Sequence, residues 1–268
     1  MKRLLVAIVT LAIGLSAVQW AGGAPLQSVA QRPGRSPVAT VHGFLTRPEP
    51  PLHAYRARRV LRASNPRFHQ SAELEVETEF SAEHGLRDRI LRESGSDMIR
   101  NRALKTILRE EQALWARREP DRAALTEHNY SFAPDDAVTE EGRIVVPIRP
   151  VRRDSMLVEG VITLSEDGDL RSVSGRLSRN PSWWTNRVDV IREYGRLGGV
   201  RVPLVMRSTA HLKLVGRSEF EMTYRYESVN GEMTAADGST DATAPAVTPV
   251  PGAASRGESR DASDPMSR

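Results

Sequence analysis

The feature that most constrains the fold is a long alternation of apolar and polar side chains over residues 202–229, which read VPLVMRSTAHLKLVGRSEFEMTYRYESV. Side chains of a β-strand point alternately to opposite faces of its sheet, so the pattern predicts two strands with one apolar face each. The two faces coincide only if the loop between the strands has an odd number of residues. We therefore expect a hairpin that sets Leu212 beside Met222 and turns through Gly216-Arg217-Ser218, where the glycine tolerates a tight turn.

Similar alternation marks strands elsewhere in the chain. In residues 72–80, AELEVETEF, glutamates alternate with mainly apolar residues, which indicates a strand with an acidic outer face and a buried inner face. Turn signals such as Asn65-Pro66 and Gly198-Gly199 separate the strands, and short connections place consecutive strands side by side in an antiparallel sheet. The strands that we expect are 53–63, 70–81 and 86–91, and then 143–151, 155–164, 170–177, 182–194, 200–215 and 218–229.

Residues 96–120, SDMIRNRALKTILREEQALWARREP, show a helical period instead. Their apolar residues recur at the spacing of one buried stripe: Ile99, Ala103, Leu104, Ile107, Leu108 and Leu114. A short second helix is expected at 121–126. Since one main helix cannot cover the apolar face of so many strands, the sheet must curl around it, dimerise or bind another molecule. The expected fold class is α+β, with a large curled antiparallel sheet, an open half-barrel, wrapped on one main helix.

The two ends of the chain differ from this central part. Residues 1–23 resemble a secretory signal peptide, with two basic residues, an apolar run and a small-residue end; an uncleaved membrane anchor is the alternative. Residues 24–52 are expected to form a basic linker rich in proline and arginine, and residues 53–230 the curled-sheet domain. Residues 231–268 have too few large apolar residues to fold and are expected to be a disordered tail. We therefore expect an exported, periplasmic protein that is soluble after removal of the signal.

Charge is uneven near the N-terminus. Residues 25–70 contain eight arginines and a single acid, Glu49. A basic arm of this kind favours anionic envelope surfaces such as lipid headgroups, whereas a solvated exposed segment is the plainer interpretation. An anionic envelope surface is thus one expected partner, and nucleic acid is not.

Catalytic and metal-binding patterns are absent from the sequence. The chain has no cysteine, which excludes thiol catalysis, thiolate metal sites, disulfides and a lipid-attachment cysteine. It has no nucleophile elbow, no glycine-rich phosphate loop and no HExxH pattern. The acidic stretch Glu166-Asp167-Gly168-Asp169 is too short for a calcium loop and is typical of a hairpin turn. We therefore expect no enzymatic activity, no metal and no cofactor.

Two adjacent tryptophans, Trp183 and Trp184, follow the turn at Pro181. Adjacent residues of a strand face opposite sides, so one tryptophan should lie inside and the other at the rim or surface of the sheet. An exposed tryptophan suggests a contact with a lipid, a glycan or a partner, and a packed edge is the plainer alternative.

The order of these elements resembles the periplasmic lipoprotein-carrier superfamily, which includes the outer-membrane lipoprotein-sorting proteins. Residues 182–231, SWWTNRVDVIREYGRLGGVRVPLVMRSTAHLKLVGRSEFEMTYRYESVNG, are most similar to the end of an uncharacterised group of bacterial exported proteins placed near that superfamily. The resemblance covers residues 53–230 and rests on strand order and on the sequence of residues 182–231, not on a functional signature.

This resemblance implies an open half-barrel whose concave side holds acyl chains and is closed by helices. It implies ligand-facing residues on the last two strands, namely Leu204, Met206, Leu212, Phe220, Met222 and Tyr224, with Trp183 and Trp184 as rim candidates. The expected function is the binding of lipid or lipoprotein acyl chains by an exported non-enzymatic protein. The alternative is a cell-envelope interaction or sensor domain whose sheet face packs on a protein partner.

Overall fold

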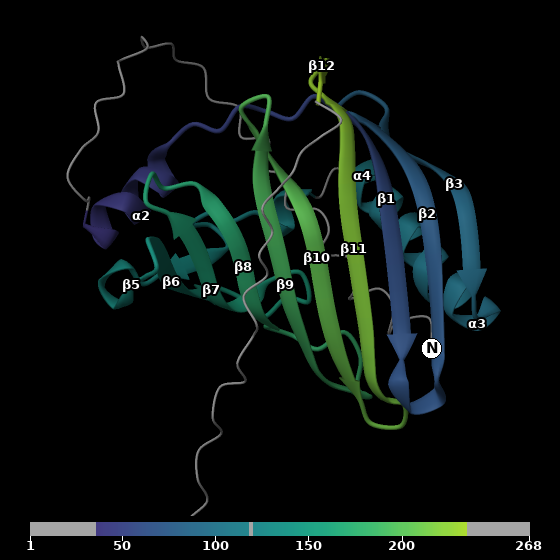
Figure 1. Cartoon of the computed structure of the whole chain (residues 1–268). Coiled ribbons are helices and arrows are strands. Elements are labelled where there is room, and N and C mark those ends of the chain that lie inside the picture. The colour runs from purple at the N-terminus through teal and green to yellow at the C-terminus, as the bar shows by residue number, and fades with distance from the viewer. Residues whose placement is uncertain (1–35, 118–119, 235–268) are drawn as a thin grey trace, which may run out of the picture. The chain divides into compact units, whose positions relative to one another are not determined.

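The computed structural model describes residues 36–117 and 120–234, which form a large antiparallel sheet with helices packed against it (Figure 1). The expected signal peptide, the first part of the expected linker and the tail beyond residue 234 lie outside the described residues. The strands are β1 (Ala54–Asn65), β2 (Gln70–Ser81), β3 (Gly85–Gly95), β4 (Tyr130–Phe132), β5 (Val138–Glu140), β6 (Arg143–Pro150), β7 (Val158–Ser165), β8 (Leu170–Leu177), β9 (Thr185–Leu197), β10 (Val200–Leu212), β11 (Gly216–Val229) and β12 (Glu232–Met233).

The strand order confirms the large antiparallel sheet that the sequence predicts. Neighbours follow the order β3-β2-β1-β11-β10-β9-β8-β7-β6-β4, with β12 on β11 and β5 on β6, and every pair is antiparallel. From β6 to β11 the strands are consecutive in both chain and sheet, as expected of a meander. The first long strand, β1, then pairs with the last long strand, β11, and this pairing joins β1–β3 to the meander.

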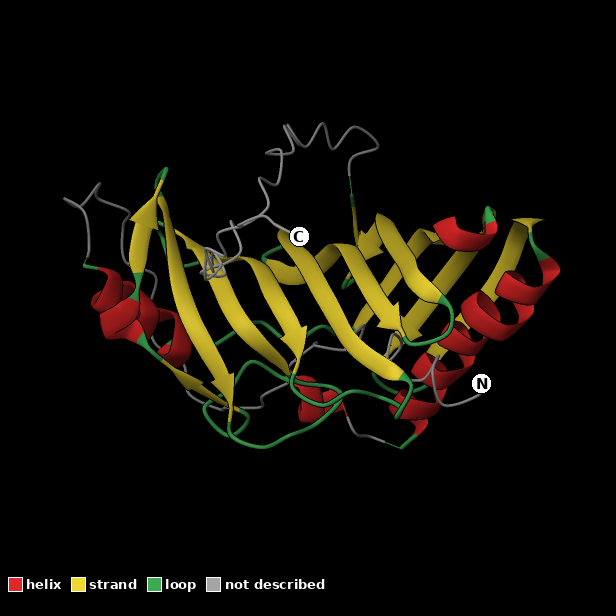
Figure 2. Cartoon of the chain, turned by 90° about the horizontal axis from the view of Figure 1, so that it is seen from below, coloured by secondary structure: helices red, strands yellow, loops and turns green. Residues whose placement is uncertain are grey.

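The main helical segment lies on the inner side of the curved sheet (Figure 2). It is continuous and comprises α3 (Asp97–Ile99), the π-helical turn η3 (Arg100–Leu104) and α4 (Lys105–Ala116). The predicted apolar stripe is buried at Leu104, Ile107, Leu108 and Leu114. The expected second helix is only a 3-10 turn, η4 (Pro120–Ala123). No helix within the described ranges is long and apolar enough to cross a membrane.

The hairpin of β10 and β11 turns earlier than the sequence suggested. Leu212 pairs with Gly216 rather than with Met222, and the loop is formed by residues 213–215. Gly216 has a φ of 77°, in the left-handed region that glycine accepts after a three-residue turn. The odd loop length is confirmed but the expected register is wrong, and Leu214 is 75% exposed at the tip instead of lying on the apolar face.

Two short elements lie in segments that were expected to be unstructured. Helix α2 (Pro37–Thr46) falls within the expected linker, and its start is capped by Ser36, whose hydroxyl accepts a hydrogen bond from the Ala39 N–H (3.3 Å). Val41 and Phe44 of α2 are buried in the main core. A helix that buries so narrow a stripe leaves little periodic signal in the sequence. At the other end, β12 extends the fold into the first residues of the expected tail.

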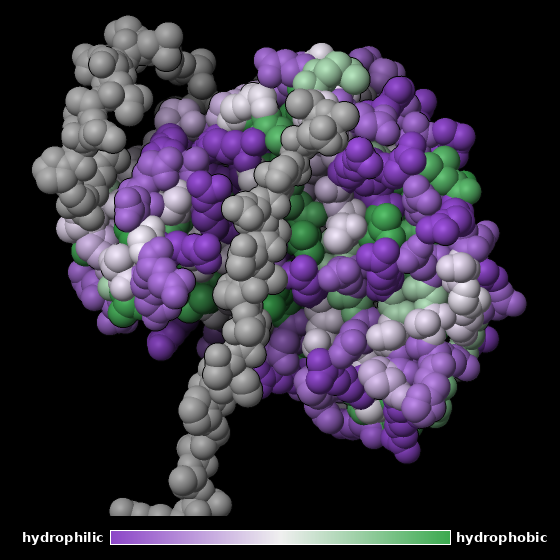
Figure 3. All heavy atoms as spheres, viewed as in Figure 1, coloured by the Kyte–Doolittle hydropathy of each residue, from purple (hydrophilic) through white to green (hydrophobic). Residues whose placement is uncertain are grey.

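The outer face of the sheet carries a ladder of ion pairs. The acidic row of β2 faces outward as predicted, and the neighbouring strands β1 and β3 supply arginines on both sides of it. Hydrophilic residues therefore dominate the face seen in Figure 3. The pairs are Arg56–Glu79, Arg58–Glu75, Arg62–Glu73, Arg89–Glu77 and Arg92–Glu73.

This pairing changes the interpretation of the N-terminal arginines. Two of the eight lie outside the described residues, and Arg67 donates a hydrogen bond to the Leu214 carbonyl. The other five form ion pairs with acids from later in the chain: Arg47, Arg56, Arg58, Arg59 and Arg62. Because this charge is compensated within the fold, the composition of the segment does not by itself argue for an anionic partner.

Candidate functional site

The inner face of the sheet carries a continuous row of buried side chains across eight strands, from β2 through β1, β11, β10, β9, β8 and β7 to β6. Residues directly opposite each other on neighbouring antiparallel strands share a face, so the pairing itself defines the row. All of its members are buried, and one of them is charged. This inner row consists of Leu74, Leu61, Met222, Met206, Arg192, Val173, Ile162 and Val146.

The six ligand-facing candidates are covered by other parts of the protein. Four of them are at most 8% exposed and share the main core with the apolar residues of α4: Met206, Leu212, Phe220 and Met222. Leu204 and Tyr224 are half-buried and pack against a second cluster that contains Tyr55 and Phe80. The inner face therefore has a cover, and contact of these residues with a ligand stays a prediction.

A buried charged cluster fastens α4 to this face. The Arg59 guanidinium of β1 has no exposed surface and contacts Glu111 of α4 (2.7 Å) and Asp88 of β3 (2.8 Å). Its Nε donates to the Thr78 hydroxyl of β2 (2.7 Å), which donates in turn to Asp88 (2.7 Å). Gln112 of α4 donates to the other oxygen of Asp88 (3.0 Å). One helix and three strands thus meet at one arginine.

Burial shifts the ionisation of this cluster. It raises the pKa of Glu111 above its ordinary value, and the charge of Arg59 opposes the rise. Burial, followed by the charge of Glu111, also raises the pKa of Tyr224, whose ring centre lies 5.6 Å from the Arg59 guanidinium carbon. Removal of one partner from such a cluster leaves an uncompensated buried charge, so the cluster fixes the position of α4 on the sheet.

A second inward arginine, Arg192 of β9, lacks such partners. It is 6% exposed and lies in the inner row between Met206 and Val173. Its Nη1 donates to the Tyr194 hydroxyl (3.0 Å), whereas its Nε and Nη2 are buried and reach no acceptor among the described residues. Because a guanidinium stays protonated in proteins, the inner face holds a positive charge with free hydrogen-bond donors.

A small cavity of about 10 Å³ adjoins Arg192. Tyr130 accepts a hydrogen bond from the Val158 N–H (3.1 Å) and Tyr194 accepts one from Arg192, so each phenol keeps its own O–H to donate. The space suits about one water molecule, and a larger guest requires the wall to move. The wall consists of Ala123, Leu125, Tyr130, Met156, Val158, Val173, Val190, Arg192 and Tyr194.

Residues 120–129, called the covering segment here, contribute Ala123 and Leu125 to that wall. Asn129 is buried and ties the segment together, because its amide donates to the Asp121 carbonyl (2.8 Å) and the Ala124 carbonyl (2.9 Å). Arg152 donates to the Asn129 side-chain oxygen (2.7 Å) and so joins the segment to the loop after β6. The covering segment is therefore held by polar contacts, while its apolar side chains face the cavity.

The two rim candidates lie in the turn before β9 and not within the strand, which begins at Thr185. Trp183 is 74% exposed and Lys213 lies over its ring at 5.8 Å, whereas Trp184 is half-buried. Trp183 is thus far more exposed than Trp184, and the difference arises in the turn and not from strand alternation. A role for either in binding stays a prediction.

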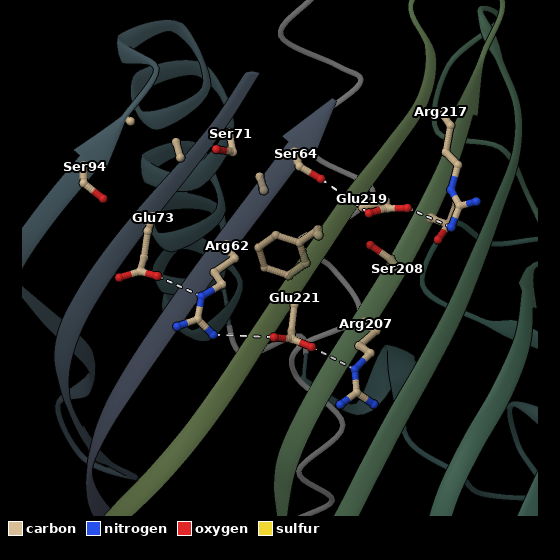
Figure 4. A pocket seen from close by; sticks show the side chains of 15 residues that line it. Arg62, Ser64, Ser71, Glu73, Ser94, Arg207, Ser208, Arg217, Glu219 and Glu221 are labelled. Atoms are coloured by element: carbon tan, nitrogen blue, oxygen red, sulfur yellow. Dashed lines mark hydrogen bonds and ion pairs between the residues drawn. The ribbon is translucent and has the colours of Figure 1, made fainter. Parts of the chain in front are cut away.

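A separate groove of about 640 Å³ is lined by residues of β1, β2, β3, β10 and β11. Figure 4 shows Arg62 between Glu73 and Glu221, with Arg207 on the other side of Glu221. The remaining two charged residues of the lining pair with each other. Since every charged side chain of this groove already has a partner, its lining does not single out a ligand.

The described acidic and histidine side chains form no metal centre. Residues 36–117 and 120–234 contain no group of three or more histidines and acids suited to hold a metal ion. The acidic stretch at 166–169 forms the turn between β7 and β8, as predicted, and its Asp169 pairs with Arg47 and Arg196.

The sequence interpretation missed both buried arginines. Arg59 stands two residues before Leu61, and Arg192 two residues after Val190, in strands that alternate. Each therefore occupies an inward position where the pattern expects an apolar residue. Since arginine is almost never fully buried unless it is paired, a charge at an inward position is the signal that would have found them.

Comparisons with known proteins give a fold likeness. A scan against protein-family models and a search of curated proteins found no match. Among solved structures, the LolA superfamily protein NE2245 from Nitrosomonas europaea matches with 8% identity and a TM-score of 0.31, over 71% of this chain and 90% of that chain. A DUF1329 family protein from Desulfovibrio piger matches with 9% identity and a TM-score of 0.31, over 70% and 88%.

At a TM-score of 0.31 both matches are a likeness of fold and carry no argument about this chain.

Proposed function

We propose that this chain is an exported, non-enzymatic protein that binds the acyl chains of a lipid or lipoprotein between the inner face of its sheet and the elements that cover it. The observation that carries the proposal is the inner row, in which seven apolar side chains and Arg192 stand in register across eight strands, covered by one main helix and the covering segment. An acyl chain in place of part of that cover would keep the inner face out of water, and each buried CH₂ would contribute about 0.8 kcal/mol.

Access to the inner row requires its cover to move. Helix α4 is attached through the Arg59 cluster, and the covering segment through Asn129 and Arg152. Directional polar contacts of this kind form together or are lost together, so they favour two discrete arrangements, covered and open. In the open arrangement Met206 and Met222 would contact the acyl chain at the centre of the face.

The proposal places the protein in the periplasm, with a lipid or an acylated protein as its partner and without a cofactor. The signal-peptide-like composition of residues 1–23 supports export. Apolar contacts alone would hold the acyl chain, so the binding function requires no reacting group.

A protein partner on the same face is the alternative function. Such a partner would also have to displace α4, because Met206 and Met222 are at most 1% exposed. A rigid protein surface has to match the shape of the uncovered face, whereas a flexible chain adapts to it, which favours the acyl ligand.

The first test is native mass spectrometry of the protein purified from the periplasm of an exporting host. We expect lipid-sized adducts on the wild type, and their loss when Met206 or Met222 is enlarged to tryptophan. Leu214→Trp is the matched control, since Leu214 is 75% exposed at a hairpin tip and its variant should keep the adduct. A bare monomer mass, together with no binding of a fluorescent fatty acid by the delipidated protein, would contradict the proposal. A co-purified protein that Met206→Asp releases, with no lipid found, would favour the alternative.

A further inference from the structure

We infer that Arg192, with Tyr130 and Tyr194, binds the oxyanion of an amphiphile whose apolar chain lies along the inner row. The ligand class is thereby narrowed to acyl compounds with a carboxylate or phosphate. The inference rests on the proposed function, because the anion is bound here as the head of an acyl ligand.

The placement of Arg192 is the first argument. In the inner row its neighbours across the strands are Met206 on β10 and Val173 on β8. The surrounding row is apolar, so the charge gains nothing from its immediate neighbours in the sheet. A positive charge 6% exposed in such a setting needs a partner, and none of the described carboxylates forms an ion pair with it.

The free donors are the second argument. Nε and Nη2 of Arg192 are both buried without an acceptor, and these two atoms lie on one edge of the guanidinium. That edge matches the two oxygens of a carboxylate or phosphate in a bidentate contact. The phenols of Tyr130 and Tyr194 line the same cavity, each with an O–H left to donate, so four donors are available to one oxyanion.

A comparison with Arg59 shows that burial of an arginine on this face is not by itself a site. Arg59 is also fully buried, but its guanidinium is bonded to Thr78, Asp88 and Glu111. Its donors are used within the protein, to hold α4. Within the described residues, the side chain of Arg192 makes a single hydrogen bond, to Tyr194. The difference assigns a structural role to the first arginine and a ligand-binding role to the second.

The apolar part of the ligand follows from the cavity. Apart from Arg192 and the two tyrosines, every residue of the wall is apolar, and two of them, Ala123 and Leu125, belong to the covering segment. Movement of that segment would extend the cavity along the inner row, away from the guanidinium. The head of the ligand would thus lie deep at β9 and its chain along the sheet.

The test measures how binding depends on the charge of the head. Delipidated full-length protein is titrated calorimetrically with oleate, with oleoyl lysophosphatidate and with uncharged monoolein. We expect the wild type to bind at least one of the two anions about tenfold more tightly than monoolein, as one charge-assisted bidentate contact requires. A preference for oleate or for the lysophosphatidate identifies the head as carboxylate or phosphate.

Variants of Arg192 test whether the guanidinium itself contacts the anion, as opposed to a general effect of charge or stability on binding. Arg192→Met should abolish the preference for anions while the affinity for monoolein stays within about twofold, and Arg192→Lys, which keeps the charge but loses the flat edge, should retain only part of it. Arg207→Met is the matched control, because Arg207 lies on β10, on the outer face with its side chain 46% exposed. In addition, the Nε–H signal of Arg192 in ¹⁵N-labelled protein should shift when the anion is added and not when monoolein is added.

The outcomes distinguish this inference from the function on which it rests. If wild type and Arg192→Met bind oleate, lysophosphatidate and monoolein equally, acyl binding stands and the role of Arg192 is refuted. If none of the three compounds binds to the wild type, both the proposed function and the inference fail. If Arg192→Met keeps the anion preference, the oxyanion is bound elsewhere and the inference is overturned.

Discussion

Replacement of Arg59 by methionine should destabilise the protein more than any other single arginine change on β1. The side chain of Arg59 is fully buried, and its loss removes contacts of 2.7 Å to Glu111, 2.8 Å to Asp88 and 2.7 Å to Thr78. Asp88 and Glu111 both lose their ion pair with Arg59, although Asp88 keeps its hydrogen bonds from Thr78 and Gln112. A buried carboxylate left in this way typically lowers the free energy of unfolding by about 3–5 kcal/mol. That is a large part of the 5–15 kcal/mol by which a domain is usually stable.

The loss should depend on pH in a defined direction. Burial raises the pKa of Glu111 in the folded protein, the charges of Arg59 and, to a lesser extent, Arg192 oppose this rise, and Arg59→Met removes the larger of these two opposing charges. The folded variant then binds a proton that the unfolded chain has released, so its free energy of unfolding falls as pH rises above the ordinary glutamate pKa of about 4.3. The difference from wild type should therefore be smaller near pH 5 than near pH 7.5, where Glu111 must either ionise without its Arg59 partner or keep its proton, and both lower the free energy of unfolding.

Urea unfolding followed by circular dichroism at both pH values measures these differences. Arg62→Met is the matched control, because Arg62 lies on the same strand, 54% exposed on the outer face, and its pairs with Glu73 and Glu221 should be worth less than about 1 kcal/mol. The reasoning is refuted if Arg59→Met costs no more than Arg62→Met near pH 7.5. It is also refuted if the loss from Arg59→Met is the same at both pH values.

Four further predictions concern stability and use the same urea assay. Arg192→Met should raise the free energy of unfolding by about 1–3 kcal/mol, because it removes buried donors without acceptors; a loss of stability would show that Arg192 supports the fold. Gly160→Ala should lower it by about 1–3 kcal/mol, since an added Cβ would lie 2.1 Å from a carbonyl oxygen of β8. Gly43→Ala in α2, where a Cβ meets nothing within 4 Å, should raise it by about 0.5–1 kcal/mol, and equal effects would contradict this packing. Met222→Ala should cost about 2–5 kcal/mol and Leu214→Ala, 75% exposed, less than about 0.5 kcal/mol, whereas the register expected from the sequence requires both to be costly.

The strands of this fold could be predicted because their side chains alternate, but the hairpin register could not. Alternation determines which face a residue occupies, so it requires an odd loop, and the observed loop of residues 213–215 obeys that rule. It does not determine the offset, because a shift by an even number of residues leaves each apolar side chain on the same face. The offset follows from Gly216, which has a positive φ and stands directly after the loop of residues 213–215. The sequence interpretation had made this glycine the first residue of the loop.

The ion pairs of the charged residues could not be predicted from the sequence for a different reason. Arginines of β1 looked like part of a free basic arm because a composition counts charges and not partners. Their partners come from β2, the next strand, and from β3, α4 and β11, and Arg47, which precedes β1, pairs with Asp169 in the turn before β8. Helix α2 was missed because its buried face is only Val41 and Phe44 with Thr40, too few residues to show a period. The ion pairs and the packing of α2 both depend on which residues meet in the folded protein. A single segment of the sequence does not contain that information.

The candidate site also depends on which residues meet in the folded protein. The six apolar residues named from the sequence lie on a face that any curled sheet of this kind needs for its core, so their burial alone does not separate a binding site from packing. The two inward arginines do distinguish a binding site from packing, because a buried charge on an apolar face requires a partner. Within the described residues Arg59 has its partners and Arg192 lacks them. If the missing partner is the head of a ligand, the protein keeps a charge on its inner face at a cost in stability. Arg192→Met should then raise the free energy of unfolding and abolish the preference for anions. These two results together would indicate that Arg192 serves function and not folding.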